Sequence, residues 1–429
     1  GPSIYNPDQL RQRQRALGYT MEELEMVLHP MGEDGKEPVG SMGDDTPLAV
    51  LSERYRGLHH FFRQNFSQVT NPPIDSLRES YQMSIKTRLG NLGNILDEDE
   101  SQSHLLQLES PVLSNSEFVA MREYMGKKAV EIDCTFDVTR ADGALREGIE
   151  RIQREAEDAV RGGAVHVILT DQAMSEKRAA IPMILAAGAV HTHLVRQQLR
   201  TFTSLNVRSG ECLDTHYFAV LIGVGATTIN AYLAEESLRD RHRRGLFPGV
   251  TPEDCVHNFK KAADQGLLKI MSKMGISVLS SYRGGYNFEA VGLSRALVAD
   301  YFPGMTSRIS GIGLTGIERK VTQLHAAAFA TANVTLPVGG FFAYRRSGET
   351  HALSGDMMHT LQSAVSTDSY AVYKRFAEMT KASPPVSLRD LLDFKVAKTA
   401  VDLDSVESIT DIRRRLVAPG ISLGALGPE

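Results

Sequence analysis

The feature that most constrains the fold of this 429-residue chain is an alternation of strand-like and helix-like segments that begins near residue 130. Residues 130–138 alternate in polarity as a strand does, and Asp142 stands where it would cap a helix with apolar residues at every third or fourth position. Gly162 and Gly163 end that helix, and the apolar run 164–170 is typical of a parallel strand covered on both faces. The sequence therefore predicts an α/β fold with a mainly parallel sheet, either open or wound toward a barrel.

The alternation continues to about residue 300, after which the pattern is helical. Within the α/β region we predict, in order, a helix over 178–198, a segment over 201–208, an apolar run over 218–224, a helix from Pro252 and a strand over 276–281. Further helices are predicted over 318–332, 357–365, 369–380, 387–394 and 405–416. The change of pattern places a domain boundary near residue 343.

Two helices are predicted ahead of the α/β region. Residues 7–30 carry apolar side chains at helical spacing, and Thr20 with Glu23 forms a capping box. The aromatic-rich residues 58–69 give the second helix. The stretch 31–47 between them is rich in Gly, Asp and Pro and is too long for a simple turn, so it is either a functional loop or a surface excursion.

Two adjacent prolines, Pro72 and Pro73, constrain the backbone just after the second of these segments. They forbid a helix and hold the preceding residues extended. The carbonyl groups of Thr70 and Asn71 are thereby left free to face another group.

Composition excludes several classes of protein. The net charge of -5 gives no overall attraction to nucleic acid or to an anionic membrane, and no apolar run approaches the roughly 20 residues of a membrane span. Cys134, Cys212 and Cys255 are far apart and form no CxxC pair, which argues against a disulfide framework and against an iron–sulfur or zinc cluster within this chain. We expect buried thiols in a reducing, cytoplasmic setting.

The glycine and histidine motifs favour structural roles. Gly223-Val-Gly225 follows an apolar run, as a dinucleotide-binding loop does, but it lacks the third glycine and a clearly placed acidic partner. We interpret it as close packing of a helix against the sheet. His191, His193 and His216 give no metal-ligand set, because residues two apart on a helix face away from each other and no acidic residue completes a known spacing.

Two glycine-rich loops with an arginine have two interpretations. Residues 280–286, with Arg283, and residues 308–316, with Arg308, follow strand-like segments, where barrel folds place ligand-binding loops. They could hold an anion, or they could be tight turns that need positive φ. No nucleophile with a base, buried carboxylate pair or P-loop is recognisable, so the residues alone indicate a soluble α/β domain without a readable active site.

Long strings of the chain resemble one family, the large chain of glutamate synthase. They are residues 40–52 (GSMGDDTPLAVLS), 68–75 (QVTNPPID), 269–277 (KIMSKMGIS) with 281–285 (SYRGG), 302–308 (FPGMTSR) and 419–429 (PGISLGALGPE). The resemblance extends over essentially residues 7–429. The family's complete chain has a glutaminase domain, a central domain, an FMN barrel with an iron–sulfur cluster, and a carboxy-terminal β-helix.

The resemblance implies a division of this chain. Residues 1–3, which lack an initial methionine, are interpreted as the remnant of a cleaved tag. Residues 4–343 are expected to be the central domain, a degenerate or incomplete TIM-barrel-like unit without its own flavin. Residues 344–429 are expected to be a helical segment leading into the truncated FMN-binding synthase domain.

The resemblance also implies two sites. In the family, ammonia from glutamine travels through an internal tunnel to 2-oxoglutarate, and the resulting imine is reduced to glutamate. Thr70-Asn71-Pro72-Pro73 would line that tunnel, and Ser41-Met42-Gly43 would approach the FMN and 2-oxoglutarate site of the missing barrel. No catalytic residue, metal site or cofactor site is expected within the fragment itself, which should be inactive, since FMN and the iron–sulfur cluster belong to the parent enzyme.

The expected partners are the glutaminase and synthase domains of the same chain, with a small NADPH-oxidising subunit or ferredoxin, and neither nucleic acid nor membrane. Two other functions stay open: a stand-alone flavin- or phosphate-binding barrel enzyme that uses the loops at Arg283 and Arg308, or a scaffold for another subunit. A yellow preparation with bound FMN would favour the first. Capture of the NADPH-oxidising subunit would favour the second.

Overall fold

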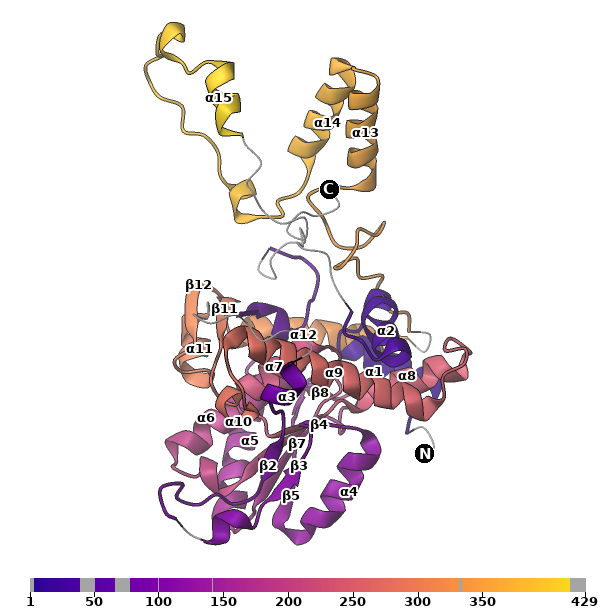
Figure 1. The fold of residues 1–429 in the computed structure, drawn as a ribbon, viewed down its shortest axis with the longest axis vertical. Coiled ribbons are helices and arrows are strands. Elements are labelled where there is room, and N and C mark those ends of the chain that lie inside the picture. Colours follow the sequence, from indigo (N-terminus) through magenta and orange to yellow (C-terminus); the bar gives the residue numbers. More distant parts are fainter. Residues whose placement is uncertain are drawn as a thin grey trace. The chain divides into compact units, whose positions relative to one another are not determined.

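The computed structural model describes residues 4–38, 51–65, 78–98, 100–140, 142–331 and 334–416 (Figure 1). The chain divides into two compact units, the first made of Gly1–Pro38 with Glu53–Gly339 and the second of Val39–Ser52 with Gly340–Glu429. All strands of the described residues belong to the first unit.

A five-stranded parallel sheet forms the centre of the first unit. Its strands, in spatial order, are β4 (Val112–Leu113), β10 (Thr228–Asn230), β9 (Ser204–Arg208), β7 (His166–Thr170) and β5 (Ala129–Asp133). Every neighbouring pair runs parallel, and β5, β7, β9 and β10 lie side by side in chain order, which is how a barrel winds. The edge strands β4 and β5 do not pair with each other in the described sheet. The predicted α/β fold with a mainly parallel, incompletely wound sheet is therefore confirmed.

Three helices cover one face of this sheet, each placed before the next parallel strand. They are α5 (Ala144–Arg161), α6 (Met183–Arg196) and α7 (Thr215–Gly223). Helix α5 shows why they pack there: Leu145, Ile149 and Ile152 recur at helical spacing and are fully buried. Residue spacing in the sequence thus places the apolar stripe of the helix against the strands.

The second face of the sheet is covered by α4 (Asn115–Met125) and by a small antiparallel pair, β2 (Thr87–Leu89) and β3 (Leu106–Leu108). Phe118, Met121 and Met125 of α4 pack with Leu89 and with Ile168 of β7 in one buried cluster. Figure 1 shows α4 and α5 on opposite sides of the strands. In a closed barrel this face would line the interior, so α4 fills the space that further strands would enclose.

A row of buried polar side chains crosses the strands under α4. Asn206 Nδ2 donates to Ser204 Oγ at 2.8 Å, Asn206 Oδ1 accepts from Thr228 Oγ1 at 2.6 Å, and Ser204 Oγ lies 2.7 Å from His166 Nδ1. Burial lowers the pKa of His166 to about 4, so its ring is neutral at neutral pH. Each polar group is satisfied by its neighbour, which is the condition for keeping such groups inside a core.

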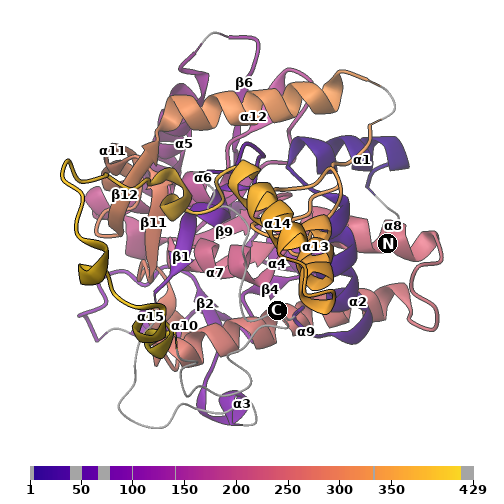
Figure 2. The same ribbon diagram turned by 90° about the horizontal axis from the view of Figure 1, so that it is seen from above.

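The other elements surround this core. The remaining strands form a three-stranded sheet of β1 (Phe62–Gln64), β11 (Phe288–Leu293) and β12 (Thr306–Ile312), and an antiparallel pair of β6 (Thr135–Asp137) and β8 (Arg178–Ala180). The remaining helices and turns of the first unit are α1 (Pro7–Ala16), η1 (Glu23–Leu28), α2 (His29–Asp34), η2 (Leu58–Phe61), α3 (Glu79–Gln82), η3 (Glu100–Ser103), η4 (Gly126–Lys128), η5 (Arg200–Phe202), α8 (Tyr232–Arg243), α9 (Pro252–Met274), α10 (Leu279–Tyr282), α11 (Arg295–Tyr301) and α12 (Leu314–Phe329). Helix α12 extends from α5 to α1 (Figure 2).

The described part of the second unit is helical. Helices α13 (Gly355–Ser366) and α14 (Tyr370–Ala382) pack against each other, and η6 (Leu388–Leu391), η7 (Leu403–Ser405) and α15 (Ile409–Arg415) follow. The helices predicted over 357–365 and 369–380 are confirmed. Those over 387–394 and 405–416 are shorter than predicted, and most of their side chains are exposed.

The helix predicted over residues 7–30 is broken. Helix α1 ends at Ala16. Gly18 adopts a φ of +83°, which glycine reaches easily but which is incompatible with a right-handed helix. The predicted capping box is confirmed, because Thr20 N donates to Glu23 Oε2 at 2.9 Å and Glu23 N donates to Thr20 Oγ1 at 3.1 Å. It begins a second helical segment, whose central part, η1, is a π-helix.

Three other predicted segments differ because distant partners decide them. Within the described part of 58–69, the turn η2 leads into β1, which pairs with β11. The strand predicted over 276–281 is reduced to a single bridge between Val278 and Ser84 ahead of α10, while the apolar run 218–224 is mostly helix α7. The strand predicted over 130–138 is divided at Cys134, whose N–H donates to the carbonyl of Thr170 at 2.8 Å.

Asp142 does not cap α5, contrary to the prediction. The N-cap residue is Gly143, and the carboxylate of Glu318 on α12 accepts from Gly143 N at 3.1 Å and from Leu145 N at 3.4 Å. A carboxylate at a helix N-terminus also interacts favourably with the positive end of the helix dipole. The cap comes from 175 residues away, which local sequence cannot reveal.

All three cysteines are buried free thiols, as predicted. Of the described helices, none combines the length and the apolar character needed to cross a membrane.

A close contact between α6 and Phe302 gives a stability prediction. A methyl group on Gly188 would lie 2.3 Å from Phe302 Cε1, and that buried ring already meets Phe62 edge-on with centroids 5.1 Å apart. We expect Gly188→Ala to lower the free energy of unfolding by about 1–3 kcal/mol through overpacking, although alanine favours a helix by about 1 kcal/mol over glycine.

Urea denaturation measures this effect. Phe302→Leu provides the matched background, since a smaller side chain relieves the clash. If Gly188→Ala lowers the free energy of unfolding as much in the Phe302→Leu protein as in the wild type, the contact with Phe302 is not the cause of the loss.

Candidate functional site

The carboxyl edge of the parallel sheet is where α/β folds bind ligands, in the loops that follow their strands. Asp171 follows β7, and Gly210 N, just after β9, donates to its two carboxylate oxygens at 2.9 and 3.1 Å. Burial raises the pKa of Asp171 to about 7, although the Gly210 N–H acts to lower it. The carboxyl group of Asp171 therefore changes its protonation state near neutral pH.

Side chains from the amino-terminal segment cover this edge. The hydroxyl group of Tyr19 donates to the carbonyl of Gly210 at 2.8 Å, and Arg13 Nη2 donates to the carbonyl of Met174 at 3.0 Å. Gln14 Nε2 donates to Ser237 Oγ of α8 at 2.7 Å. The place that barrel enzymes use for a ligand is filled by the chain itself.

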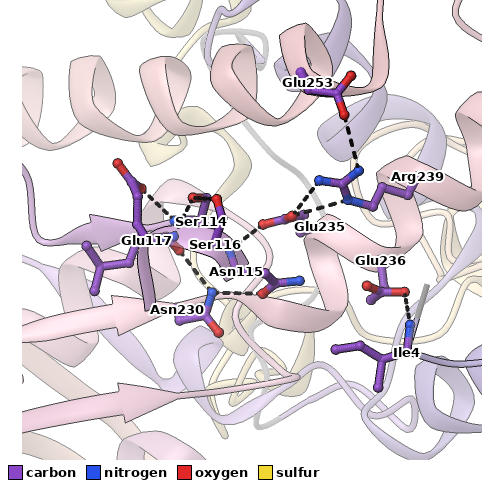
Figure 3. Close-up of polar contacts among 11 residues, drawn as sticks. Ile4, Ser114, Asn115, Ser116, Glu117, Asn230, Glu235, Glu236, Arg239 and Glu253 are labelled. Atoms are coloured by element: carbon purple, nitrogen blue, oxygen red, sulfur yellow. Dashed lines mark hydrogen bonds and ion pairs between the residues drawn. The ribbon is translucent and has the colours of Figure 1, made fainter. Parts of the chain in front are cut away.

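A polar network ties the ends of β4 and β10 to α8 (Figure 3). Asn230 Nδ2 donates to the carbonyl of Leu113 and to Asn115 Oδ1, both at 3.0 Å, while its Oδ1 accepts from Arg208 Nε at 3.2 Å. The backbone N–H of Asn115 donates to Glu235 Oε2 at 2.7 Å.

The same network extends to the start of α4 and along α8 (Figure 3). Ser114 and Glu117 form a reciprocal capping box at the α4 N-terminus. Glu235 pairs with Arg239 at 3.1 Å. The network fixes the direction in which α4 leaves β4.

Partly buried acidic groups continue from this edge to the start of α7. Asp214 caps α7 by accepting from Tyr217 N at 2.7 Å. Burial acts to raise its pKa, but His59, whose Nε2 lies 3.7 Å away, and further partners hold it at about 2. Glu211 accepts from Tyr217 Oη at 2.5 Å and from Met183 N at 2.9 Å, and burial raises its pKa.

These carboxyl groups position structural elements. Each of Asp171, Glu211 and Asp214 accepts a backbone N–H at the start of a loop or helix. Burial likewise raises the pKa of Glu23, in the capping box, to about 7. These raised and lowered pKa values make the stability of the fold depend on pH. The carboxyl groups use their hydrogen bonds on backbone N–H groups of the chain itself.

The glycine motif is a packing motif, as the sequence indicated. A Cβ on Gly223 would lie 2.4 Å from Phe288 Cε2, and one on Gly225, whose φ is +122°, would lie 2.3 Å from His191 Nδ1. Both glycines therefore allow side chains from other elements to approach the backbone closely.

In the part of the chain that the structure describes, the histidines bind different partners and form no common site, and neither arginine loop follows a strand. His193 Nε2 lies 2.7 Å from Glu157, and His216 Nε2 donates to the carbonyl of His59 at 2.9 Å. No cluster of His, Cys, Asp and Glu that could hold a metal occurs among the described residues. Arg308 lies within β12, and Arg283 follows α10, so neither follows a strand as predicted.

An open cavity of about 400 Å³ lies between α1, α8 and residues 334–335. Its charged lining is balanced, with Arg11 and Arg244 against Asp8 and Asp240. The full lining is Pro7, Asp8, Leu10, Arg11, Gln14, Asp240, Arg244, Val334 and Thr335. The volume is within the range of small-molecule sites, but Arg244 and Asp240 already lie 3.9 Å apart.

A family model described as the glutamate synthase central domain matches residues 12–294. The chain belongs to this family. It is 66% identical over 428 residues to the glutamate synthase (NADPH) large chain of Azospirillum brasilense, which covers 100% of this chain and 28% of that protein. It is 40% identical over 444 residues to the chloroplastic ferredoxin-dependent glutamate synthase of Spinacia oleracea, covering 100% of this chain and 27% of that one.

The chain thus spans less than a third of the length of these glutamate synthases. Among solved structures, a flavocytochrome b2 double mutant with bound pyruvate matches 64% of this chain and 82% of that chain at 10% identity and a TM-score of 0.28. A likeness of that size carries no argument about the fold.

Both sites implied by the resemblance to glutamate synthase lie outside the described residues. Ser41-Met42-Gly43 falls within 39–50, and Thr70-Asn71-Pro72-Pro73 falls within 66–77. Their roles therefore stay predictions.

Sequence reasoning misses two residues of the carboxyl edge in this glutamate synthase domain. Asp171 directly follows the predicted strand 164–170, and its position at the carboxyl end of a parallel strand is a usable signal. Asn230 is harder to find, since it belongs to the short strand β10, for which the sequence pattern predicts no element.

The raised pKa of Asp171 predicts a pH-dependent stability. Its pKa is higher in the folded chain than in the unfolded chain, so folding favours the protonated form and the carboxylate lowers stability as pH rises from about 4 to about 7. We expect Asp171→Asn to gain stability relative to the wild type between pH 5 and pH 7.5, by about 1.4 kcal/mol for each tenfold difference in proton affinity.

Denaturant unfolding at both pH values tests this expectation. Asp214→Asn is the matched control, because the low pKa of Asp214 keeps it ionised over the whole interval. A difference between Asp171→Asn and the wild type that stayed constant with pH would contradict the assignment.

Proposed function

We propose that this chain is the connecting part of a glutamate synthase, an enzyme that converts glutamine, 2-oxoglutarate and a reductant into two glutamate molecules. The observation that carries the proposal is the match of the central-domain family over residues 12–294, together with 66% identity to a glutamate synthase large chain along the whole sequence. The chain joins the glutaminase and synthase domains and guides ammonia between them.

The carboxyl edge of the sheet supports a connecting role. Tyr19 and Arg13 contact the loops after β9 and β7, where a flavin barrel would hold its cofactor. These side chains do not fit a flavin there. FMN and the iron–sulfur cluster accordingly belong to the synthase domain of the parent enzyme.

Thr70-Asn71-Pro72-Pro73 lines the ammonia tunnel, and Ser41-Met42-Gly43 faces the FMN and 2-oxoglutarate site. The described residues flanking the tunnel segment are anchored, which supports a fixed wall. Asn65 N donates to the carbonyl of Asn287 at 3.1 Å, and Ser84 N donates to that of Ser277 at 2.8 Å. A tunnel wall needs a fixed backbone and the exclusion of water.

Residues 4–343 form the central domain, and residues 344–429 begin the synthase domain. The division of the chain into compact units at Gly339 and Gly340 supports a boundary in this region. The redox partner is a small NADPH-oxidising subunit or ferredoxin, since relatives of both descriptions align with the chain at 66% and 40% identity.

The alternative of a stand-alone flavin enzyme is tested with the purified chain. On the proposed function it is colourless and neither hydrolyses glutamine nor forms glutamate. Saturable binding of FMN would count for the alternative.

The tunnel assignment predicts a specific defect in the full-length enzyme. Asn71→Trp should narrow the passage, so that glutamine hydrolysis continues while less of its ammonia reaches 2-oxoglutarate. We expect the glutamate formed per glutamine hydrolysed to fall by severalfold, whereas synthesis from added ammonium should fall less.

Tyr81→Trp is the control, since that side chain on α3 is 89% exposed. It should leave the two rates coupled. If Asn71→Trp also left glutamate synthesis coupled one-to-one with glutamine hydrolysis, Asn71 would not line the passage.

A further inference from the structure

The amino edge of the parallel sheet carries an unusual group of basic side chains. Arg200, in η5, donates from Nε to His191 Nδ1 at 2.9 Å, from Nη1 to the carbonyl of Thr203 at 2.7 Å and from Nη2 to that of Gly225 at 2.8 Å. Thr203 and Gly225 precede β9 and β10. Arg200 therefore holds together the loops that enter two neighbouring strands.

His191 is held as a neutral ring. A guanidinium group can only donate, so Nδ1 accepts and the ring proton lies on Nε2. Burial lowers the pKa of His191 to about 3, with Arg200 and Arg283 adding to the effect. The backbone of Gly284 lies against the other side of the ring, since a Cβ there would be 3.3 Å from Nε2. His191 thus adds a hydrogen-bond donor to the group without adding a charge.

Arg283 is the second guanidinium of the group. Its Nη2 donates to Thr87 Oγ1 at 2.7 Å, and that hydroxyl donates in turn to the carbonyl of Thr227 at 3.0 Å. Its Nε is buried and has no hydrogen-bond partner among the described residues. One strong donor is therefore left unsatisfied inside the protein, which costs free energy.

The two guanidinium groups lack an acidic partner. Within the described residues, neither Arg200 nor Arg283 forms an ion pair with a carboxylate, whereas Arg178, for example, lies 3.3 Å from Asp133. Burial, with the neighbouring Arg283, lowers the pKa of Arg200 to about 10, and burial does the same for Arg283. Two desolvated cations that lie close enough to repel each other are unfavourable unless an anion lies with them.

We propose that Arg200 and Arg283, with the Nε2–H of His191, form a binding site for a small oxyanion, either a phosphate or a carboxylate group. Both anions accept paired N–H groups from guanidinium forks, and Arg283 Nε supplies a donor already in place. Both arginine side chains keep partial exposure, which gives a solute access. The bound anion would join the loops before β9 and β10 to the loop after α10.

Inorganic phosphate and glutarate, each titrated into the purified 429-residue chain at constant ionic strength, test the proposal. Isothermal calorimetry should show saturable binding, and the melting temperature should rise with ligand concentration. The ¹⁵N shift of His191 Nε2 should move with the same saturation curve. Arg283→Gln should weaken binding at least about tenfold and abolish the shift.

Arg308→Gln is the matched control. That side chain is 79% exposed and lies 3.7 Å from Glu289, so its loss should leave binding unchanged. Absence of saturable binding up to tens of millimolar would overturn the proposal. So would equal affinity in Arg283→Gln and the wild type.

The full-length enzyme separates two sources of the anion. If it binds phosphate as the chain does, the site takes a free solute. If the chain binds phosphate and the full-length enzyme does not, an acidic side chain elsewhere in the parent polypeptide supplies the same chemistry.

Discussion

The constraint on which the rest of the structure depends is the covering of both faces of the five-stranded sheet. Its strands wind in barrel order, yet Phe118, Met121 and Met125 of α4 occupy the face that a barrel would turn inward. Asn206 sits on that face, and its amide bonds to Val167 of β7, to Ser204 of its own strand and to Thr228 of β10. Losing α4 would expose both an apolar cluster and this polar row, so the open sheet and its covering helix are stable only together.

This constraint explains how the two edges of the sheet differ. At the carboxyl edge, the loops are bound by Tyr19, Arg13 and Gln14 from the amino-terminal segment. At the amino edge, the loops are bound by Arg200, whose cationic neighbour has no acidic partner in the described residues. A domain of the glutamate synthase family built in this way presents a fixed scaffold at one edge and an incompletely neutralised one at the other.

The sequence was a good guide where short-range pattern decides structure. The apolar run 164–170 is a buried parallel strand, the Thr20–Glu23 capping box forms, and the glycine pair at 223 and 225 serves close packing. It failed where a distant partner decides. Phe62 joins a strand because Ala290 lies opposite, and α5 is capped by Glu318 because α12 passes its N-terminus.

The candidate sites likewise divide into those that short-range sequence pattern indicates and those that depend on distant partners. Asp171 could be found from its place after a strand, and the loop of Arg283 had two interpretations, as an anion site or as a tight turn. That Arg283 stands beside Arg200 without a carboxylate depends on which groups the fold brings near, and no spacing in the chain encodes it.

The covering of the carboxyl edge by the amino-terminal segment has a consequence for synthesis on the ribosome. Tyr19 bonds to a residue 191 positions later, and Gln14 to one 223 positions later. At the usual speed of translation, roughly ten seconds or more pass before these partners emerge. Helix α1 leaves the ribosome well ahead of these partners, so it is among the last elements of this unit to reach its place, and the nascent chain must carry its apolar side unprotected in the meantime.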